Sequence, residues 1–511
     1  MVKADKNIMR GLLVFSYMFI ISLLIFLISS SFSYLNTGAD RSKMLHTEVE
    51  KAEVYSPKMI WTEDGNEGRE LDEQTLAKIE NDYLDAWYVK HVAYKTNQTT
   101  GIDDFYTDSA RKNIFAFITQ NQQENISVDA TTLSHQPNIE FFSADGQLIV
   151  LKDENVVEYK QLYKDGKFVM ETTEVANYKA VLLLEDGFWR VRHLVKERVK
   201  TVAKSKETKA VSNLNLKGIN YYPQATPWDM FDDEFDIETI KKDFDIIQDA
   251  GLNTIRIFVQ YEDFGKANVQ QDKLEKLQQV LDAAEIKKLK VVLTLFDFYG
   301  NYEILDWTLT QRHAETIVSE FKNHNAIVAW DIKNEPNLDF ESRGKENVLA
   351  WLESMISLVK SIDNKRMVTI GWSNTESAHL LQDKLDFVSF HYYEDKADFE
   401  QSYLDLKAKI TDKPIILGEF GQSSYGGFWR PFAGSEKKQA TYFKEMQQVL
   451  QSQNISYLAW TLYDFENVPS SVVGSRPWRT NPQKKFGIID KDGKKKAAFE
   501  FVIEKGFSIE K

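Results

Sequence analysis

The C-terminal part of the chain contains eight short apolar runs that alternate with amphipathic stretches. Runs of this kind are typical of strands buried on both faces, and the stretches between them show the helical period. The runs are residues 216–222, 254–259, 290–296, 326–332, 367–372, 387–392, 414–418 and 455–462, and the clearest helices are 237–250, 274–287, 348–362 and 436–450. Eight strands with intervening helices predict an α/β fold, a (β/α)8 barrel over residues 214–511. A doubly wound parallel sheet is the alternative fold.

Two glutamates lie at the ends of two of these runs. Glu335 ends the segment AIVAWDIKNE, and Glu419 follows PIILG. In the predicted barrel these positions end strands four and seven, where catalytic groups of such barrels lie. A carboxylate at the tip of an apolar strand is costly to bury without a partner. Glycosidases use such a pair, since one carboxyl group protonates the leaving oxygen and the other attacks or stabilises the sugar cation. For each glutamate alone, a strand-end residue that caps the next helix is the alternative.

Six positions, in the expected order along the chain, resemble glycoside hydrolase clan A, especially its family-5-like cellulases and mannanases. They are Arg256 in TIRIF, Asn334 and Glu335 in WDIKNEP, His391 and Tyr393 in FHYY, Glu419 in ILGEFG and Trp460 in LAWTLYDF, with Asn334 and Glu335 counted as one strand-four pair. One position departs from the pattern. Many family-5 enzymes carry a histidine at strand three, where this chain has the segment FDFY that contains Asp297.

The resemblance implies a retaining mechanism. Glu335 would be the acid/base, holding its proton because its site is apolar and a second carboxylate lies nearby. Glu419 would be the nucleophile, kept ionised by hydrogen bonds from Arg256 and Tyr393. Asn334 is expected to bond the sugar 2-OH.

Four further residues are expected to contact the sugar or the carboxyl groups. His391 would orient Glu335 or the sugar, with a packed histidine that donates to the backbone as the alternative. Trp460, Trp372 and Tyr222 fall at or beyond strand ends, where aromatic rings can stack on sugar faces, although aromatic residues also fill ordinary cores. The eight histidines show no metal-binding spacing, so the sequence predicts no metal and no other cofactor.

The N-terminus carries a targeting signal. Residues 11–38 contain no charged residue, and 12–28 are almost wholly apolar. About 20 such residues span the hydrocarbon core of a bilayer. Lys3, Lys6 and Arg10 precede the segment and favour a cytoplasmic N-terminus. We therefore predict a cytoplasmic segment 1–10, a transmembrane anchor 11–31, and the rest of the chain outside the cytoplasm of a bacterial cell, with a cleaved signal peptide as the alternative.

Two segments lie between this anchor and the barrel. Residues 36–70 are polar without a sustained period and are predicted to be a tether. Residues 71–200 are predicted to form a small α+β domain that resembles the NTF2-like (SnoaL-like) fold. The expected elements are a helix at 76–88, strands at 147–151, 156–163, 168–172 and 175–184, and turns at Asp145-Gly146, Asp165-Gly166 and Asp186-Gly187. No acid/base constellation stands out there, so a spacer or interaction module is expected.

Composition excludes several classes of function. The net charge is −14 without a basic block, which argues against a nucleic-acid partner. With no cysteine, the chain has no disulfide, thiolate metal site or cysteine nucleophile. The sequence predicts a membrane-anchored retaining β-glycosidase of a β-linked glucan or mannan. One alternative is a transglycosylase that remodels an exopolysaccharide beside its synthase. Another is a non-catalytic polysaccharide-binding scaffold, against which the carboxylate pair argues.

Overall fold

The computed structural model describes residues 16–23, 55–62, 65–201, 214–410, 412–427, 434–473 and 476–503. The chain divides into two compact units, the N-terminal unit Met1–Val202 and the barrel unit Ala203–Lys511. The predicted segment 1–10 and most of the predicted anchor 11–31 and tether 36–70 lie outside the described residues. Residues 16–23 are helical. Among the helices that the structure describes, none combines the length and apolar character needed to cross a membrane.

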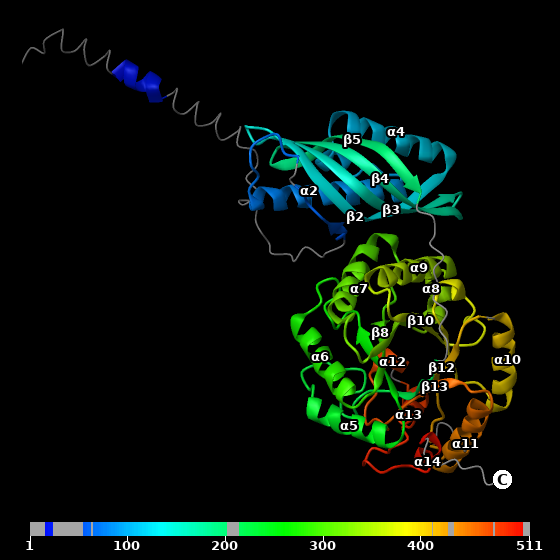
Figure 1. Ribbon diagram of the computed structural model, residues 1–511. Helices are drawn as coiled ribbons and strands as arrows, with labels where there is room; N and C mark the ends of the chain where they lie inside the picture. The colour runs from blue at the N-terminus through cyan, green and yellow to red at the C-terminus, as the bar shows by residue number, and fades with distance from the viewer. Residues whose placement is uncertain are drawn as a thin grey trace, which may run out of the picture. The chain divides into compact units, whose positions relative to one another are not determined.

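The barrel unit is a closed barrel of eight parallel strands (Figure 1). In chain order these are β6 (Lys217–Asn220), β7 (Thr254–Gln260), β8 (Lys290–Asp297), β9 (Ile327–Asn334), β10 (Met367–Trp372), β11 (Val388–Tyr392), β12 (Ile415–Phe420) and β13 (Ser456–Ala459). Each strand pairs with its neighbour in sequence, and β13 pairs with β6 to close the barrel. The predicted (β/α)8 fold is confirmed, and the doubly wound sheet is not formed.

Helices follow most of the strands and surround the barrel in Figure 1. The longer ones are α5 (Ile237–Asp249), α6 (Gln271–Ile286), α7 (Trp307–Phe321), α9 (Lys345–Ile362), α10 (Phe399–Lys409) and α11 (Glu436–Ser452), and the short ones are α8 (Phe340–Arg343), α12 (Ser470–Val473), α13 (Pro477–Gln483) and α14 (Phe499–Val502). In α5 the buried side chains Ile240, Phe244 and Ile247 recur at helical spacing, and Asp236 caps the helix by accepting the Glu238 N–H.

A cluster of apolar side chains packs near the amino-terminal ends of the strands. Its buried members are Leu216, Val292, Ala329, Phe387, Ile416 and Leu458. Each precedes its strand or lies within the strand's first three residues. This end of the barrel is therefore packed, which leaves the carboxyl ends of the strands for the functional groups.

Between residues 55 and 201, the described part of the N-terminal unit combines a five-stranded sheet with three helices (Figure 1). The strands, in sheet order, are β1 (Lys58–Met59), β2 (Ile126–Phe142), β3 (Leu148–Lys164), β4 (Lys167–Glu185) and β5 (Phe188–Thr201), and the helices are α2 (Glu73–Thr96), α3 (Ile102–Phe105) and α4 (Asp108–Glu124). Strands β2 to β5 are antiparallel. The buried core combines side chains of the helices and the sheet, among them Tyr83, Trp87 and Trp189. The resemblance to the NTF2-like fold stays a prediction.

Several boundaries in this unit differ from the sequence prediction. The expected helix 76–88 is the longer α2, and the expected strands 168–172 and 175–184 form one strand, β4. The predicted tether ends at residue 70, yet β1 pairs with β2, and Tyr55, Met59 and Trp61 pack against the core. Their apolar rings and chains anchor this stretch, so ordered structure begins earlier than predicted. The expected strands 147–151 and 156–163 form one strand, β3, whose register shifts between Asp153 and Val156. A β-bulge accommodates polar residues without ending the strand.

Candidate active site

The chain turns sharply after β9 and delivers Glu335 to the mouth of the barrel. Glu335 adopts left-handed backbone angles, φ 48° and ψ 47°, which a residue with a side chain rarely does. Its N–H donates to the Gly371 carbonyl at 2.7 Å, and Pro336 begins a 3-10 turn directly afterwards. Such a conformation costs on the order of 1–3 kcal/mol and is concentrated at functional sites.

Glu419 lies within β12, with its carboxyl group buried at the same end of the barrel. Tyr393 donates its hydroxyl to Glu419 Oε1 at 2.5 Å. Arg256 Nη1 lies 3.4 Å from Glu419 Oε2. The backbone packs closely at the preceding Gly418, where a Cβ would lie 2.2 Å from Ser389 Oγ. These contacts are the ones predicted to keep a nucleophilic carboxylate ionised.

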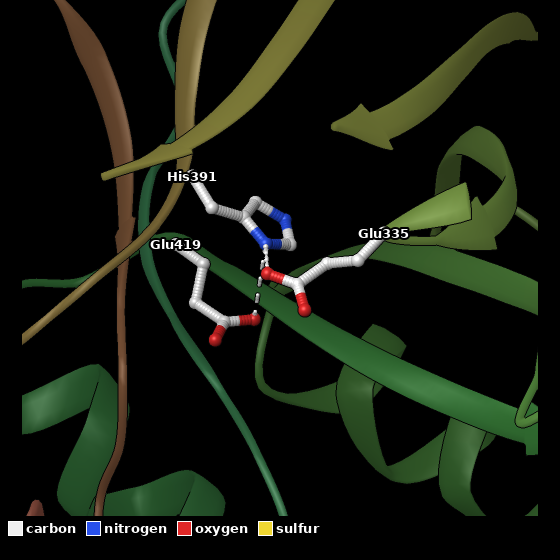
Figure 2. A group of neighbouring side chains, drawn as sticks. All are labelled: Glu335, His391 and Glu419. Carbon is white, nitrogen blue, oxygen red and sulfur yellow. Dashed lines mark hydrogen bonds and ion pairs between the residues drawn. The ribbon is translucent and has the colours of Figure 1, made fainter. Parts of the chain in front are cut away.

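His391 on β11 stands between the two glutamates (Figure 2). Its Nδ1 lies 2.8 Å from Glu335 Oε1 and 3.8 Å from Glu419 Oε2. The His391 side chain is fully buried. A carboxylate oxygen of Glu335, one of Glu419 and a ring nitrogen of His391 all lie within 4.8 Å of one another. This close spacing matches retaining glycosidases, whose carboxyl groups lie about 5–5.5 Å apart.

Arg256 holds the floor of the site through a buried ion pair. It donates to Asp331 Oδ2 from Nε at 2.9 Å and from Nη2 at 2.6 Å. It also donates to Asn334 at 2.9 Å and to Asn220 at 3.1 Å. Arg256 is 2% exposed, so its buried side chain is placed to position the groups around it. The sequence predicted Arg256 as a substrate-binding residue that also bonds Glu419, and the contact with Glu419 is the one that the structure shows. Asp331 was not predicted as a site residue. Its charge inside the apolar run of β9 could have indicated a functional position.

The pKa values of the two carboxyl groups shift in opposite directions. Burial acts to raise the pKa of Glu335, but the hydrogen bond from His391 and the charges of Arg256 and Lys333 outweigh it and hold this pKa below its ordinary value. Burial raises the pKa of Glu419, and the negative charge of Glu335 adds to that effect. In the site without substrate the pKa of Glu335 is therefore lowered and that of Glu419 is raised. The roles of Glu335 as acid/base and of Glu419 as nucleophile stay predictions.

The predicted aromatic residues divide into two groups. Tyr222 and Trp460 line the cleft, where Tyr222 stacks on Phe258 with ring centroids 5.1 Å apart. Trp228 joins them, 5.8 Å from the Trp460 ring. Trp372 has no exposed surface and is not part of the cleft lining. Trp372 ends its strand, but its ring is buried in the core. Its placement therefore does not support the prediction that it contacts sugar.

A cleft of about 1070 Å³ opens above the glutamates. Asn334, Tyr393, Glu335 and Glu419 line it, together with residues from the segments that follow β6, β8, β12 and β13. Asp297 and Lys333 also face it, and the sequence analysis assigned neither. The departure from the family pattern at strand three was the available signal for Asp297.

Glu335, His391 and Glu419 are also the described side chains that lie close enough together to hold a metal ion. Several of these atoms already take part in hydrogen bonds. His391 Nδ1 is bonded to Glu335 Oε1, and Glu419 Oε1 accepts from the Tyr393 hydroxyl. The arrangement suits proton transfer and nucleophilic attack between two carboxyl groups and a sugar.

Several known proteins are similar to this chain. Human β-glucuronidase is 25% identical over 302 residues, which cover 54% of this chain and 43% of that protein. A mannan endo-1,4-β-mannosidase of Emericella nidulans is 24% identical over 238 residues, 35% of this chain and 61% of the relative. The chain spans less than half of the length of the β-glucuronidases that it matches. Among solved structures, an exo-β-1,4-mannosidase from Opitutaceae bacterium strain TAV5 has a TM-score of 0.48 and 16% identity, covering 60% of this chain and 61% of that one.

The family comparison covers the barrel itself. The model of the cellulase family, glycosyl hydrolase family 5, matches residues 205–466, just over half of the chain. This range includes every strand of the closed barrel and both glutamates. The chain therefore belongs to glycosyl hydrolase family 5.

Proposed function

We propose that this protein is a retaining β-glycosidase that cleaves a β-linked polysaccharide or oligosaccharide of the glucan or mannan type. One observation carries the proposal: Glu335 and Glu419 stand at the ends of strands four and seven with carboxylate oxygens within 4.8 Å, joined by His391. The spacing leaves no room for a water between the sugar and Glu419, as an inverting enzyme would need. Similarity to mannan endo-β-mannosidases supports the substrate class.

In the first step Glu335 protonates the glycosidic oxygen while Glu419 attacks the anomeric carbon. A sugar oxygen that accepts a hydrogen bond from Glu335 favours the protonated form of this carboxyl group. Glu419 must then be ionised, and the donors Tyr393 and Arg256 stabilise that charge. The leaving sugar departs and a covalent glycosyl ester on Glu419 remains.

In the second step Glu335 acts as a base and removes a proton from the incoming acceptor. Attack on the ester returns the original β configuration and frees Glu419. Water gives hydrolysis, whereas a sugar hydroxyl gives transglycosylation, the alternative that shares this site. The cleft of about 1070 Å³ has room for an acceptor sugar beside the bound one.

NMR of the first-formed product tests the proposal. We expect the β-anomer from a panel of β-glucans and β-mannans, and an initial α-anomer would contradict the retaining assignment. Glu335→Gln and Glu419→Ala should each lower turnover by orders of magnitude without loss of fold. Azide should restore activity to Glu419→Ala with inverted product. Normal rates in both variants would make the chain a binding protein.

We also propose that residues 11–31 anchor the protein in a bacterial membrane, with residues 1–10 in the cytoplasm and the rest of the chain outside it. The uncharged segment 11–38 and the preceding Lys3, Lys6 and Arg10 support this topology. The N-terminal unit would then act as a spacer or interaction module, and a polysaccharide synthase would be a neighbour. Cell fractionation tests the anchor: the intact chain should require detergent for release. A soluble mature protein that begins near Ser33 would contradict it.

A further inference from the structure

The turn that carries Glu335 has a backbone conformation that its own sequence does not favour. Glu335 has the left-handed angles φ 48° and ψ 47°. A residue with a side chain keeps such angles only where the surrounding structure holds them. The contacts on either side of this turn therefore decide where the carboxyl group of Glu335 lies.

On one side the turn is bound to the end of β10 and the residue that follows it. The Glu335 N–H donates to the Gly371 carbonyl at 2.7 Å. Asn337 Nδ2 donates to Ser373 Oγ at 2.7 Å, and Asn337 Oδ1 accepts the Ser373 N–H at 2.9 Å. These bonds fix the backbone of the turn against the neighbouring strand.

On the other side a buried lysine closes the turn. Lys333 lies near the end of β9, directly before Asn334, and is 5% exposed. Its Nζ donates to the Asn334 carbonyl at 3.2 Å and lies 3.4 Å from Asp339 Oδ2. Lys333 lines the cleft, but its ammonium group is bound within the turn. Because Lys333 precedes Glu335 and Asp339 follows it, the bridge between them spans Glu335.

The carboxylate of this bridge is itself anchored in the segment after β8. Tyr302 donates its hydroxyl to Asp339 Oδ2 at 2.5 Å. Tyr302 is 3% exposed, its carbonyl accepts the indole N–H of Trp307 at 3.1 Å, and its ring centroid lies 5.4 Å from that of Trp351. The bridge therefore joins the turn to packed aromatic side chains.

We propose that Lys333 and Asp339 form a positioning bridge that holds the carboxyl group of Glu335 where it can protonate the glycosidic oxygen. The inference rests on the proposed glycosidase function, because Glu335 is the acid/base only in that mechanism. Both residues act through Glu335 and are positioning residues. Loss of the bridge should therefore slow the cleavage of substrates that need this proton and spare substrates that do not.

The test uses the full-length protein and two substrates that share one sugar and differ in the leaving group. Phenoxide is a poor leaving group and needs the proton, whereas 2,4-dinitrophenolate is a stable anion that leaves without it. The sugar is β-D-glucose or β-D-mannose, whichever the wild type cleaves faster. For each substrate kcat/KM is measured, because it reports the first step, in which Glu335 acts as the acid.

We expect Lys333→Met and Asp339→Asn each to lower kcat/KM for the phenyl glycoside by about tenfold or more, and for the dinitrophenyl glycoside by less than about threefold. Glu335→Gln should show the same selective loss to a larger extent. A residue that only contacts the sugar would affect both substrates alike, because the sugar is the same.

A matched control removes a paired lysine elsewhere in the barrel unit. Lys384 is partly buried, lies 2.7 Å from Glu353 in an ion pair and is not part of the cleft lining, so Lys384→Met should leave both kcat/KM values unchanged. Equal losses for the two substrates, or no loss, in the folded bridge variants overturn the inference. If Lys333→Met does not fold, Asp339→Asn decides alone, since 28% of the Asp339 side chain is exposed.

Failure of the proposed function gives a different result. A wild type that hydrolyses neither these glycosides nor β-glucans and β-mannans refutes the proposed function, and this inference falls with it. An active wild type whose Glu335→Gln variant shows no selective loss refutes the acid/base role of Glu335 and overturns the inference as well. Where Glu335→Gln shows the selective loss and the bridge variants do not, the inference alone is wrong.

Discussion

Tyr393 gives the nucleophile its shortest hydrogen bond, and its removal tests how much that bond contributes. Its hydroxyl lies 2.5 Å from Glu419 Oε1, while 43% of the side chain is exposed. A hydrogen bond to a charged group contributes about 1.5–3 kcal/mol, so Tyr393→Phe should lower kcat roughly 10–100-fold. Steady-state kinetics on the best substrate should show this loss with little change in KM or in unfolding midpoint.

A matched control is Tyr163→Phe on β3 of the N-terminal unit, which removes a hydroxyl bonded to Gln161 and should leave kcat unchanged. If Tyr393→Phe turns over at the wild-type rate, the hydroxyl does not stabilise the charge on Glu419. Arg256 would then be the main group that does so.

Asp297 should make the stability of the barrel unit depend on pH. Its folded pKa is about 6 against an ordinary value of 3.8, and Lys333, Arg256 and Tyr222 are the groups that face it. Between these values the folded chain binds a proton at Asp297 that the unfolded chain does not, so the contribution of Asp297 to stability is most favourable below pH 4 and falls as pH rises through 6. The difference amounts to about 3 kcal/mol. Urea unfolding of wild type against Asp297→Asn should show it.

In that experiment the variant lacks this titration, and other groups cancel in the comparison. The gap between wild type and Asp297→Asn should therefore move in favour of wild type on going from pH 7 to pH 4. A gap that is constant with pH would mean that Asp297 titrates at its ordinary value in the folded chain.

The sequence identified some residues of the site and missed or misplaced others. Glu335 and Glu419 each stand in a short motif at a strand end, so local pattern was sufficient. Asp331 was missed because its partner Arg256 lies 75 residues earlier, and one sequence does not show which inward side chains meet across strands. Trp372 was misplaced for a related reason: a strand-end position does not tell which way a ring points.

At the level of elements, the barrel was predictable, whereas strands β1 and β2 of the N-terminal sheet were not. Strands of a parallel barrel are buried on both faces and appear as continuous apolar runs. Strand β2 shows no such run, because its buried positions include Thr131, Thr132 and His135. The turns at Asp165-Gly166 and Asp186-Gly187 were predictable, since both residues of each adopt positive φ as hairpin turns require.

Strands β2 and β3 and helix α2 share a buried polar network that the sequence analysis did not find. Asp153 accepts from His135 Nδ1 at 2.6 Å, from the Tyr83 hydroxyl at 2.9 Å and from the Gln136 N–H at 2.9 Å. His135 Nε2 lies 2.7 Å from Thr132 Oγ1. Asp153 and His135 have no exposed surface, so each depends on its partners.

Asp153→Ala should therefore destabilise the N-terminal unit strongly. It leaves His135 and Tyr83 buried without an acceptor, which costs about 3–5 kcal/mol. Chemical unfolding should report this loss, and Glu197→Ala at an exposed site of β5 should stay within about 0.5 kcal/mol of wild type. A loss below about 1 kcal/mol in Asp153→Ala would show that the network adds little to stability.

On the scale of the whole molecule, the chain consists of two units with separate cores. Side chains from α2 to α4 and β2 to β5 form one core, and those of the barrel form another. The compact division falls between Val202 and Ala203. The residues of the candidate active site all belong to the barrel unit. The family match, which begins at residue 205, also lies entirely within this unit. Catalysis should therefore need no residue of the N-terminal unit.

The last prediction follows from this division. Residues 203–511 expressed alone should fold and should hydrolyse small soluble glycosides with a kcat/KM within about threefold of the full-length protein, because a domain with its own core folds independently. Glu419→Ala in the same fragment should be inactive, which excludes a contaminating enzyme. Circular dichroism and steady-state kinetics are the measurements. A fragment that folds but has lost activity would show that the N-terminal unit acts on the cleft, and a polymer-specific loss would assign it to binding long substrates.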